Sequence, residues 1–464
     1  MAEQKTSFWD RARPVLDRYA PTERQRVFAF TLVTGAICGL AAVAFHLGIQ
    51  FAERRMIDRA FAAPNHSWIF WVIATPTLGG LVAGILLTYV VPGAAGSGIP
   101  QVKAAYAFGS ERLSFGDAVG KFFLSILQIG SGASLGREGP TVQICSGIIN
   151  KIARNLPITP QSRHRMLPVA AAAGIAAAFN APISAIIFTV EEVVGEMDQT
   201  LLTGVVVAAA IAAVVERSIL GHHPVLHVAV TYGLEHASQL LAYGLLGLVA
   251  AGVSALFRES LLRLRLRFKG WHAVPAWIHP AIGGAVTGAI AVAAMISVKT
   301  GGINGGGYDV LSAALAGSLT LKVMLALCFL KIAATVFSYA SGGAGGIFAP
   351  ALFVGAMLGG VFGHLDQAVF QHSGESIGAF ALVGMGAVFA GLIRAPITSI
   401  LIIFEMTGNY ELILPLMISN MLSYTLSHHW SPMPLYDALL LQDGIELPHP
   451  AERQVPGNVI SAVG

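Results

Sequence analysis

The sequence predicts an all-α polytopic membrane protein built from two related halves. Of its 464 residues, 55% are hydrophobic and only 11% are charged, whereas a soluble protein carries about 25% charged residues. Because so few charges cannot cover a water-exposed surface, most of the surface must face lipid. Apolar runs of about 20 residues, the length that crosses about 30 Å of hydrocarbon, recur between Val27 and His428. The clearest are residues 69–91, 201–215, 239–257 and 274–298.

Two pairs of similar segments indicate the two halves. Lys121–Pro140 (KFFLSILQIGSGASLGREGP) matches Lys331–Pro350 (KIAATVFSYASGGAGGIFAP) in spacing from Lys to Pro. Asn180–Glu191 (NAPISAIIFTVE) and Arg394–Glu405 (RAPITSILIIFE) each place an acid nine residues after the proline, and both pairs come in the same order. A duplicated membrane protein with glycine-interrupted segments is typical of transporters with a site at the bilayer midplane. The sequence alone does not separate parallel from inverted repeats.

The ends of the chain are expected to lie in the cytoplasm. Residues 1–26 carry charges of both signs and no apolar core of a signal peptide. Their five arginines, together with a second basic run at 258–269, place this side inside by the positive-inside rule. A net charge of +3 is too small to suggest nucleic acid. We expect a cytoplasmic N-terminal segment, a first membrane repeat, a connecting loop, a second membrane repeat and a short cytoplasmic tail, at 1–26, 27–219, 220–237, 238–436 and 437–464.

No metal site or cofactor is expected. The three cysteines, Cys38, Cys145 and Cys328, lie far apart in apolar surroundings and suggest small packing residues rather than a disulfide framework or a zinc site. Adjacent histidines at 222–223 and 428–429 are a poor zinc pair without a further ligand at helical spacing. They are interpreted as polar residues at helix ends.

Three glycine- and proline-containing segments predict junctions between a loop and a helix: 96–100 (GSGIP), 136–140 (GREGP) and 346–350 (GIFAP). Glycine gives backbone freedom, and proline is accepted in the first turn of a helix. A helix N-terminus presents free N–H groups and about half a positive charge. Several such ends aimed at one point form an anion site without a buried lysine. The full charge of a lysine would hold the ion too tightly for conduction.

These three segments, in this order and at this spacing, resemble the signature segments of the CLC chloride channels and transporters. Pro434-Leu435-Tyr436 resembles the segment that supplies the coordinating tyrosine of that family. The resemblance extends from about residue 27 to residue 440. It implies a homodimer whose subunits each have their own pore and about 18 helices, many tilted or broken, in two inverted repeats.

The resemblance also implies roles for individual residues. Ser97 and Tyr436 would donate hydroxyls to chloride, and the backbone N–H groups of Ile347 and Phe348 would donate to the same ion. Glu138 would be the gating and external proton-transfer glutamate, and Glu192 the internal one. The implied selectivity filter comprises Gly96, Ser97, Gly98, Ile99, Pro100, Gly136, Arg137, Glu138, Gly139, Pro140, Gly346, Ile347, Phe348, Ala349 and Pro350.

The acids also have simpler interpretations. Glu138 could serve only as a helix-start acid or as the partner of Arg137. The adjacent Glu191 and Glu192 do not share a helix face, so they should do different jobs, and Glu192 could instead be a solvated helix end. Gln101 and Lys103 replace acids that are frequent in bacterial exchangers of the family, which we interpret as a change in surface potential at the inner mouth.

The favoured function is exchange of chloride for protons in a prokaryotic inner (plasma) membrane, since Glu138 and Glu192 are both present. The alternative is a passive voltage- or pH-gated chloride channel of the same fold. Transport of nitrate or fluoride is a further alternative, which Ser97 and Tyr436 disfavour by resemblance. An intramembrane hydrolase is disfavoured because no histidine is paired in sequence with a candidate serine, so an enzyme is not expected.

Overall fold

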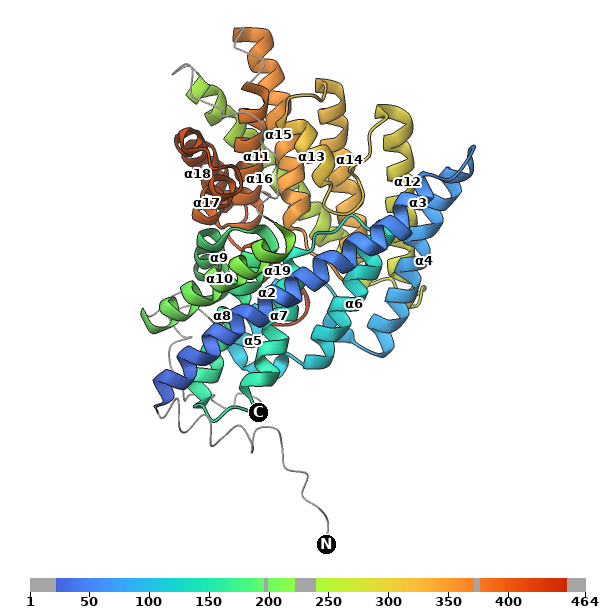
Figure 1. Cartoon of the computed structure of the whole chain (residues 1–464). Coiled ribbons are helices and arrows are strands. Elements are labelled where there is room, and N and C mark those ends of the chain that lie inside the picture. The colour runs from blue at the N-terminus through green and yellow to red at the C-terminus, as the bar shows by residue number, and fades with distance from the viewer. Residues whose placement is uncertain (1–21, 196–198, 222–238, 371–375, 449–464) are drawn as a thin grey trace.

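The computed structural model describes residues 22–195, 199–221, 239–370 and 376–448, and this part of the chain is helical (Figure 1). The predicted segments 1–26 and 437–464 and the connecting loop 220–237 fall largely outside the described residues, as do His222 and His223. The α-helices are α2 Glu23–Arg55, α3 Ile57–Phe61, α4 Ser67–Tyr89, α5 Ile99–Phe108, α6 Phe115–Ser131, α7 Glu138–Ala153, α8 Pro160–Phe179, α9 Pro182–Phe188, α10 Gln199–Leu220, α11 Gln239–Lys269, α12 His279–Val298, α13 Tyr308–Leu315, α14 Leu321–Ala340, α15 Phe348–Phe370, α16 Ser376–Ile393, α17 Pro396–Thr407, α18 Ile413–Trp430 and α19 Leu435–Gln442. Five short helical turns join them: η1 Pro92–Ala94, η2 Ser110–Arg112, η3 Thr189–Val194, η4 Ala276–Ile278 and η5 Tyr410–Leu412.

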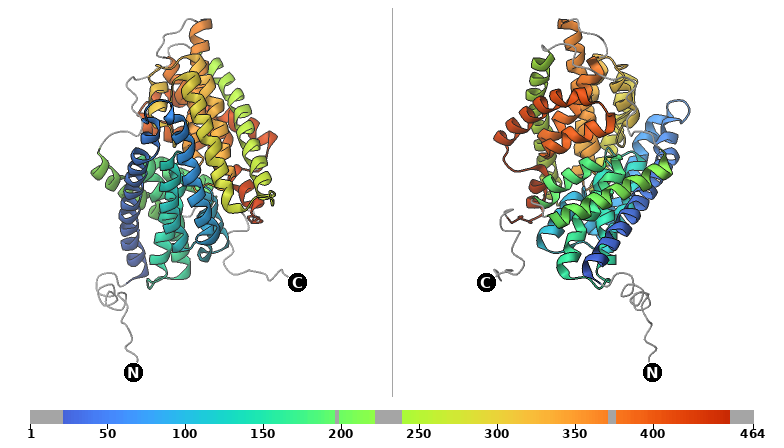
Figure 2. Two further views of the ribbon diagram at one scale, coloured as in Figure 1. Left: turned by 90° about the vertical axis from the view of Figure 1, so that its right-hand side faces the viewer. Right: turned by 60° about the vertical axis from the view of Figure 1, so that its left-hand side comes forward.

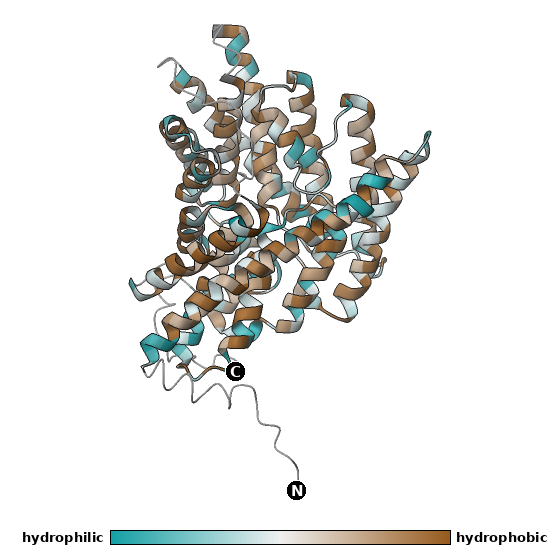
Figure 3. Cartoon of the chain, viewed as in Figure 1, coloured by the Kyte–Doolittle hydropathy of each residue, from teal (hydrophilic) through white to brown (hydrophobic). Residues whose placement is uncertain are grey.

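Seven helical segments of the described chain are long and apolar enough to cross a membrane. Their outward surfaces carry large apolar side chains such as Phe51, Phe70 and Leu241, of which Leu241 is 76% exposed. Hydrophobic residues predominate along the helices in Figure 3. In water such a surface would be unfavourable, whereas lipid tails solvate it, so the chain is an integral membrane protein.

The first half, blue to green, occupies the lower part of Figure 1, and the second half, yellow to red, the upper part. Figure 2 shows the same division from two further directions. Helices α15 and α16 form the most deeply buried layer of the second half, and α7 and α8 that of the first. Both layers therefore keep the signature segments away from lipid.

Helices α4 and α12 pack against each other reciprocally. A methyl group on Gly80 would lie 2.2 Å from the carbonyl oxygen of Pro280, and one on Gly284 would lie 2.1 Å from that of Pro76. Such close approach requires glycine on both helices. Residue numbers rise along one helix as they fall along the other, so these corresponding membrane-spanning helices are antiparallel. The two halves are therefore inverted repeats, which the sequence left open.

The second sequence echo is a reciprocal pair of helix caps. The Glu191 carboxylate accepts hydrogen bonds from the backbone N–H of Thr398 (2.8 Å) and from its hydroxyl (2.6 Å), at the start of α17. The Glu405 carboxylate accepts from the N–H of Ser184 (2.6 Å) and from its hydroxyl (2.5 Å), at the start of α9. Each acid satisfies free donors and the positive end of a helix dipole in the other half. The repeated acid therefore joins the two halves.

Candidate functional site

The three predicted junctions meet through their backbones. Gly96 N–H donates to Gly343 O (3.0 Å), and Gly345 N–H donates back to Gly96 O (3.1 Å). Gly136 and Gly346 exchange two N–H···O bonds of 2.7 Å each. The loops immediately before α5, α7 and α15 are thus tied into one small backbone cluster. Three helix N-termini from both halves converge there, as the sequence predicted.

Two glycines let the first and second junctions touch. Gly98 has a φ of +103°, in the region that favours glycine, and a methyl group there would lie 2.4 Å from Gly139 O. A methyl group on Gly139 would lie 2.5 Å from both the carbonyl oxygen and the hydroxyl of Ser97. The start of α5 therefore lies directly against the start of α7, with Ser97 between them.

Two buried lysines hold glycine-rich loops in place. Lys121, wholly buried in α6, donates from Nζ to Ala94 O (2.7 Å) and Gly96 O (2.6 Å), at the base of the first junction. Its repeat partner Lys331 donates to the carbonyl oxygens of Gly302, Ile303 and Gly305 at 2.9, 2.9 and 2.7 Å. A buried ammonium is tolerable only when its protons are bound in this way. The matched lysines are therefore loop anchors, a role that sequence comparison did not assign.

Ser97 and Tyr436 lie together at the cluster. Both side chains are fully buried, and the Tyr436 hydroxyl lies close enough to Ser97 for the two hydroxyls to interact with each other. Neither hydroxyl makes a well-formed hydrogen bond to another described residue. Buried polar groups in proteins nearly always have a partner, so two such hydroxyls side by side mark a place for a ligand that accepts hydrogen bonds.

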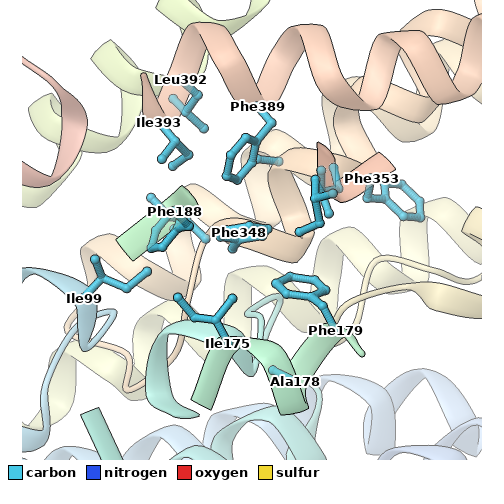
Figure 4. Close-up of a cluster of buried hydrophobic side chains, with 14 of the residues drawn as sticks. Ile99, Ile175, Ala178, Phe179, Phe188, Phe348, Phe353, Phe389, Leu392 and Ile393 are labelled. Atoms are coloured by element: carbon cyan, nitrogen blue, oxygen red, sulfur yellow. The ribbon is translucent and has the colours of Figure 1, made fainter. Parts of the chain in front are cut away.

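Ile347 and Phe348 lie at the third junction of the same cluster. Both are buried, and their backbone N–H groups donate to no acceptor among the described residues. Figure 4 shows the Phe348 ring among three others: its centroid lies 4.7 Å from that of Phe179, 5.7 Å from Phe188 and 4.2 Å from Phe389. This packing fixes the first turn of α15, so that its free N–H groups keep their direction.

Glu138 begins α7 and is 1% exposed. Its Oε1 accepts a 2.5 Å hydrogen bond from the Tyr308 hydroxyl, while Oε2 has no partner among the described residues. Arg137 does not pair with it: the guanidinium donates to Ala178 O (3.2 Å) and lies 5.6 Å from the centre of the Tyr308 ring. The interpretation of Glu138 as the partner of Arg137 is therefore wrong.

Tyr308 was missed by the sequence analysis. It begins α13 directly after the glycine-rich stretch 301–307, which could have marked a loop that approaches the site. Tyr308, Arg137 and Leu135 line a cavity of about 680 Å³, which Glu53, Asp58, Asp309 and Glu216 also line. Glu138, which is hydrogen-bonded to Tyr308, therefore lies directly behind one wall of this cavity.

Glu192 lies away from Glu138, in the turn η3. It is 3% exposed, so the interpretation as a solvated helix end is wrong. Its Oε1 accepts a 2.8 Å hydrogen bond from Lys103 Nζ, which also lies 2.5 Å from Asp437 Oδ1. Glu191, its neighbour, caps α17, so the expectation of different jobs for the two acids is confirmed.

The expected effect of Gln101 and Lys103 on surface potential is also corrected. Lys103 is 6% exposed and ion-paired, so its charge does not act at the surface. The Gln101 side chain accepts from Gly98 N–H (2.9 Å) and donates to Ala95 O (2.7 Å). It therefore closes the loop that carries Ser97.

Fold and site together define an integral membrane protein in which two inverted halves bring helix N-termini and two adjacent buried hydroxyls to one buried point suited to an anion. The chain matches the family described as Voltage gated chloride channel over residues 79–428, and it belongs to that family. The resemblance stated from the sequence motifs is thereby confirmed.

Two similar proteins are named as exchangers. The H(+)/Cl(-) exchange transporter ClcA of Cronobacter sakazakii (strain ATCC BAA-894) is 33% identical over 416 residues, covering 88% of each chain. ClcA of Salmonella newport (strain SL254) is 30% identical over 421 residues, covering 89% of this chain and 88% of its own.

Solved structures share the fold. A slow cyanobacterial Cl-/H+ antiporter has a TM-score of 0.81 at 22% identity, covering 90% of this chain and 98% of its own. A eukaryotic CLC transporter has a TM-score of 0.76 at 21% identity, covering 90% and 74%. A CLC-type fluoride/proton antiporter has a TM-score of 0.71 at 20% identity, covering 94% and 99%. The predicted fold class is confirmed.

Proposed function

We propose that this protein exchanges chloride for protons across a membrane, with chloride bound by Ser97, Tyr436 and the N–H groups of Ile347 and Phe348. The observation that carries the proposal is the pair of adjacent buried hydroxyls of Ser97 and Tyr436, neither of which makes a well-formed hydrogen bond to another described residue, beside converging helix N-termini. Dipoles and hydroxyls bind an anion without a full positive charge, so the ion can leave again. The relatives named as chloride/proton exchangers support the same ion pair.

Two buried acids supply the proton route. Glu138 lies at the start of α7, next to the junction that carries Ser97, and Glu192 lies beyond the site, near Asp437. A carboxylate buried in a membrane protein is stable only when it is paired, protonated or exchanged with an ion. We assign Glu138 to gating and external proton transfer and Glu192 to internal proton transfer.

The assembly and its placement extend this proposal. We propose a homodimer with a pore in each subunit, set in a prokaryotic inner membrane with both termini cytoplasmic. The arginine-rich segment before Val27 and the basic run at 258–269 support this orientation. The domain boundaries at 27–219 and 238–436 are supported by the inverted pairs α4/α12 and α9/α17, which take one member from each half.

The test is chloride-driven proton uptake into liposomes. Vesicles that hold purified protein and high chloride are placed in weakly buffered low-chloride medium, and external pH is followed with a valinomycin/potassium clamp. Exchange predicts alkalinisation outside that a protonophore abolishes. Chloride efflux without proton movement would establish the passive channel instead. Fluoride or nitrate efflux that exceeds chloride efflux would overturn the choice of anion.

A further inference from the structure

A single buried cation joins the internal proton site to the helix that carries the chloride-binding tyrosine. Lys103 Nζ in α5 lies 2.8 Å from Glu192 Oε1 in η3 and 2.5 Å from Asp437 Oδ1 in the first turn of α19. Asp437 directly follows Tyr436 in the sequence. Three elements distant in the chain are therefore linked through one ammonium group.

The charges of this triad do not cancel. One ammonium faces two carboxylates, so the fully ionised triad carries one net negative charge, and two of its three members are buried. Bringing charge into a low dielectric is costly, and one added proton makes the triad neutral. Around Glu192 the charged groups are Lys103, Asp437 and Glu191 of its own turn, and Glu191 is already bonded to the start of α17. The triad is therefore suited to hold one exchangeable proton.

The three members differ in their access to the surface. The side chains of Lys103 and Glu192 are 7% and 3% exposed, whereas that of Asp437 is 27% exposed. A proton that approaches along this side of α19 therefore meets Asp437 before Glu192. Lys103, which contacts both carboxylates, is the group between them.

We propose that Asp437 and Lys103 extend the internal proton route, with Asp437 as the acid that exchanges protons with the surface. In the step from the protein surface to Glu192, the protonated Asp437 carboxyl gives its proton to Lys103 Nζ as Nζ gives one of its own protons to Glu192. The ammonium keeps three protons and its charge, and the negative charge moves from Glu192 to Asp437. This inference rests on the proposed exchange function and names an additional part of it.

Asp437→Asn tests the relay, because it keeps the side-chain shape and removes the titrating group. Proton and chloride fluxes are measured in the same liposomes between pH 5 and 8. We expect proton flux to fall about a hundredfold or more, the size of effect that a positioned acid or base supplies, while chloride flux continues. Asp437→Glu, which keeps an acid, should retain most of the proton flux.

Asp443→Asn is the matched control for structure. Asp443 follows α19, pairs with Arg265 (2.7 Å) and Lys269 (2.5 Å), and anchors this helix to α11 without contacting Glu192. If loosening α19 were the cause, this variant would lower proton flux relative to chloride flux as well. The relay would be overturned if Asp437→Asn and Asp443→Asn lowered the ratio of proton flux to chloride flux equally. It would also be overturned if Asp437→Asn left that ratio unchanged.

Lys103→Met tests the cation independently. Without the ammonium, Glu192 and Asp437 are two like charges in one site, and one proton is held tightly. We expect slower proton flux whose optimum moves to higher pH, and adding Asp437→Asn to the same chain should move the optimum back toward the wild-type pH without restoring the flux. A wild-type pH profile in Lys103→Met would overturn the proposal. If the wild type itself moves chloride without protons, the proposed function fails before the relay is tested.

Discussion

Removing the Tyr308 hydroxyl gives the most specific test of how Glu138 is held. Tyr308→Phe deletes one oxygen, the donor of the 2.5 Å bond to Glu138 Oε1. The other carboxylate oxygen has no partner among the described residues, so the carboxylate would then be buried with none. A hydrogen bond to a charged group is worth about 1.5–3 kcal/mol.

That loss has a direct consequence for chloride. The conformation in which the Glu138 carboxylate lies next to Tyr308 would become about tenfold less populated for each ~1.4 kcal/mol lost. The carboxylate would then move toward the anion site. Because it then competes with chloride, we expect the dissociation constant for chloride to rise about tenfold, measured by titration calorimetry in detergent at pH 7.5.

A double-mutant cycle decides whether this reasoning is correct. In Glu138→Ala there is no carboxylate to release, so adding Tyr308→Phe should leave chloride affinity unchanged. The result that refutes the reasoning is unaltered chloride affinity in Tyr308→Phe alone, or the same loss of affinity with and without Glu138. The second outcome would mean that Tyr308 acts on the anion site by another route.

The remaining predictions concern the acids, the close packing and the reciprocal caps. Glu138→Ala should move chloride without proton coupling, because an alanine neither carries a proton nor closes the pathway; surviving proton pumping in liposomes would refute the gate assignment. Glu192→Gln should also stop proton flux while chloride still moves, and retained coupling would place the internal route elsewhere. Gly139→Ala should destabilise the site by about 1–3 kcal/mol through overpacking and reduce chloride flux, whereas Gly252→Ala, inside α11 where nothing lies within 4 Å, should leave flux unchanged and should not lower the melting temperature, because alanine favours a helix more than glycine does. Glu405→Gln should lower the free energy of unfolding by about 1–2 kcal/mol, since it weakens charge-assisted bonds to the start of α9; an unchanged melting temperature in detergent would contradict that cap.

Much of the site follows from local sequence. Glycine and proline at 96–100, 136–140 and 346–350 predict helix starts because their backbone chemistry permits little else there, and the structure has α5, α7 and α15 beginning at Ile99, Glu138 and Phe348. The spacing of the two echoes identified the repeat. Its inverted orientation required the antiparallel packing of α4 on α12.

A third echo was present in the sequence and was missed. Residues 76–84 read PTLGGLVAG and residues 280–288 read PAIGGAVTG. Gly80 and Gly84 contact residues 277–281, and Gly284 and Gly288 contact residues 72–77, so the pattern records packing between the halves, whereas Gly79 and Gly283 face the side chains of Ser131 and Ser341. It carries no polar signature residue, which is why it resembles ordinary apolar sequence until the helices are seen side by side.

The remaining features depend on contacts between distant residues. Lys103 pairs with Glu192 across 89 positions, and Tyr308 reaches Glu138 across 170. Nothing local distinguishes Lys103 from a lysine on a solvated helix face, because burial is decided by α19 and η3 packing over it. Local sequence identifies the starts of α5, α7 and α15, whereas these pairs are set by the tertiary fold.

The central claim is that one buried pathway couples the two ions, and the voltage at which no net current flows tests it most directly. Purified protein is reconstituted into planar bilayers or voltage-clamped liposomes with a fixed chloride gradient, and a pH gradient is then imposed. Coupled exchange predicts a zero-current voltage that departs from the chloride equilibrium potential and moves with each added unit of pH difference. A zero-current voltage that stays at the chloride equilibrium potential at every pH gradient would contradict the account and leave a passive anion pathway on this fold.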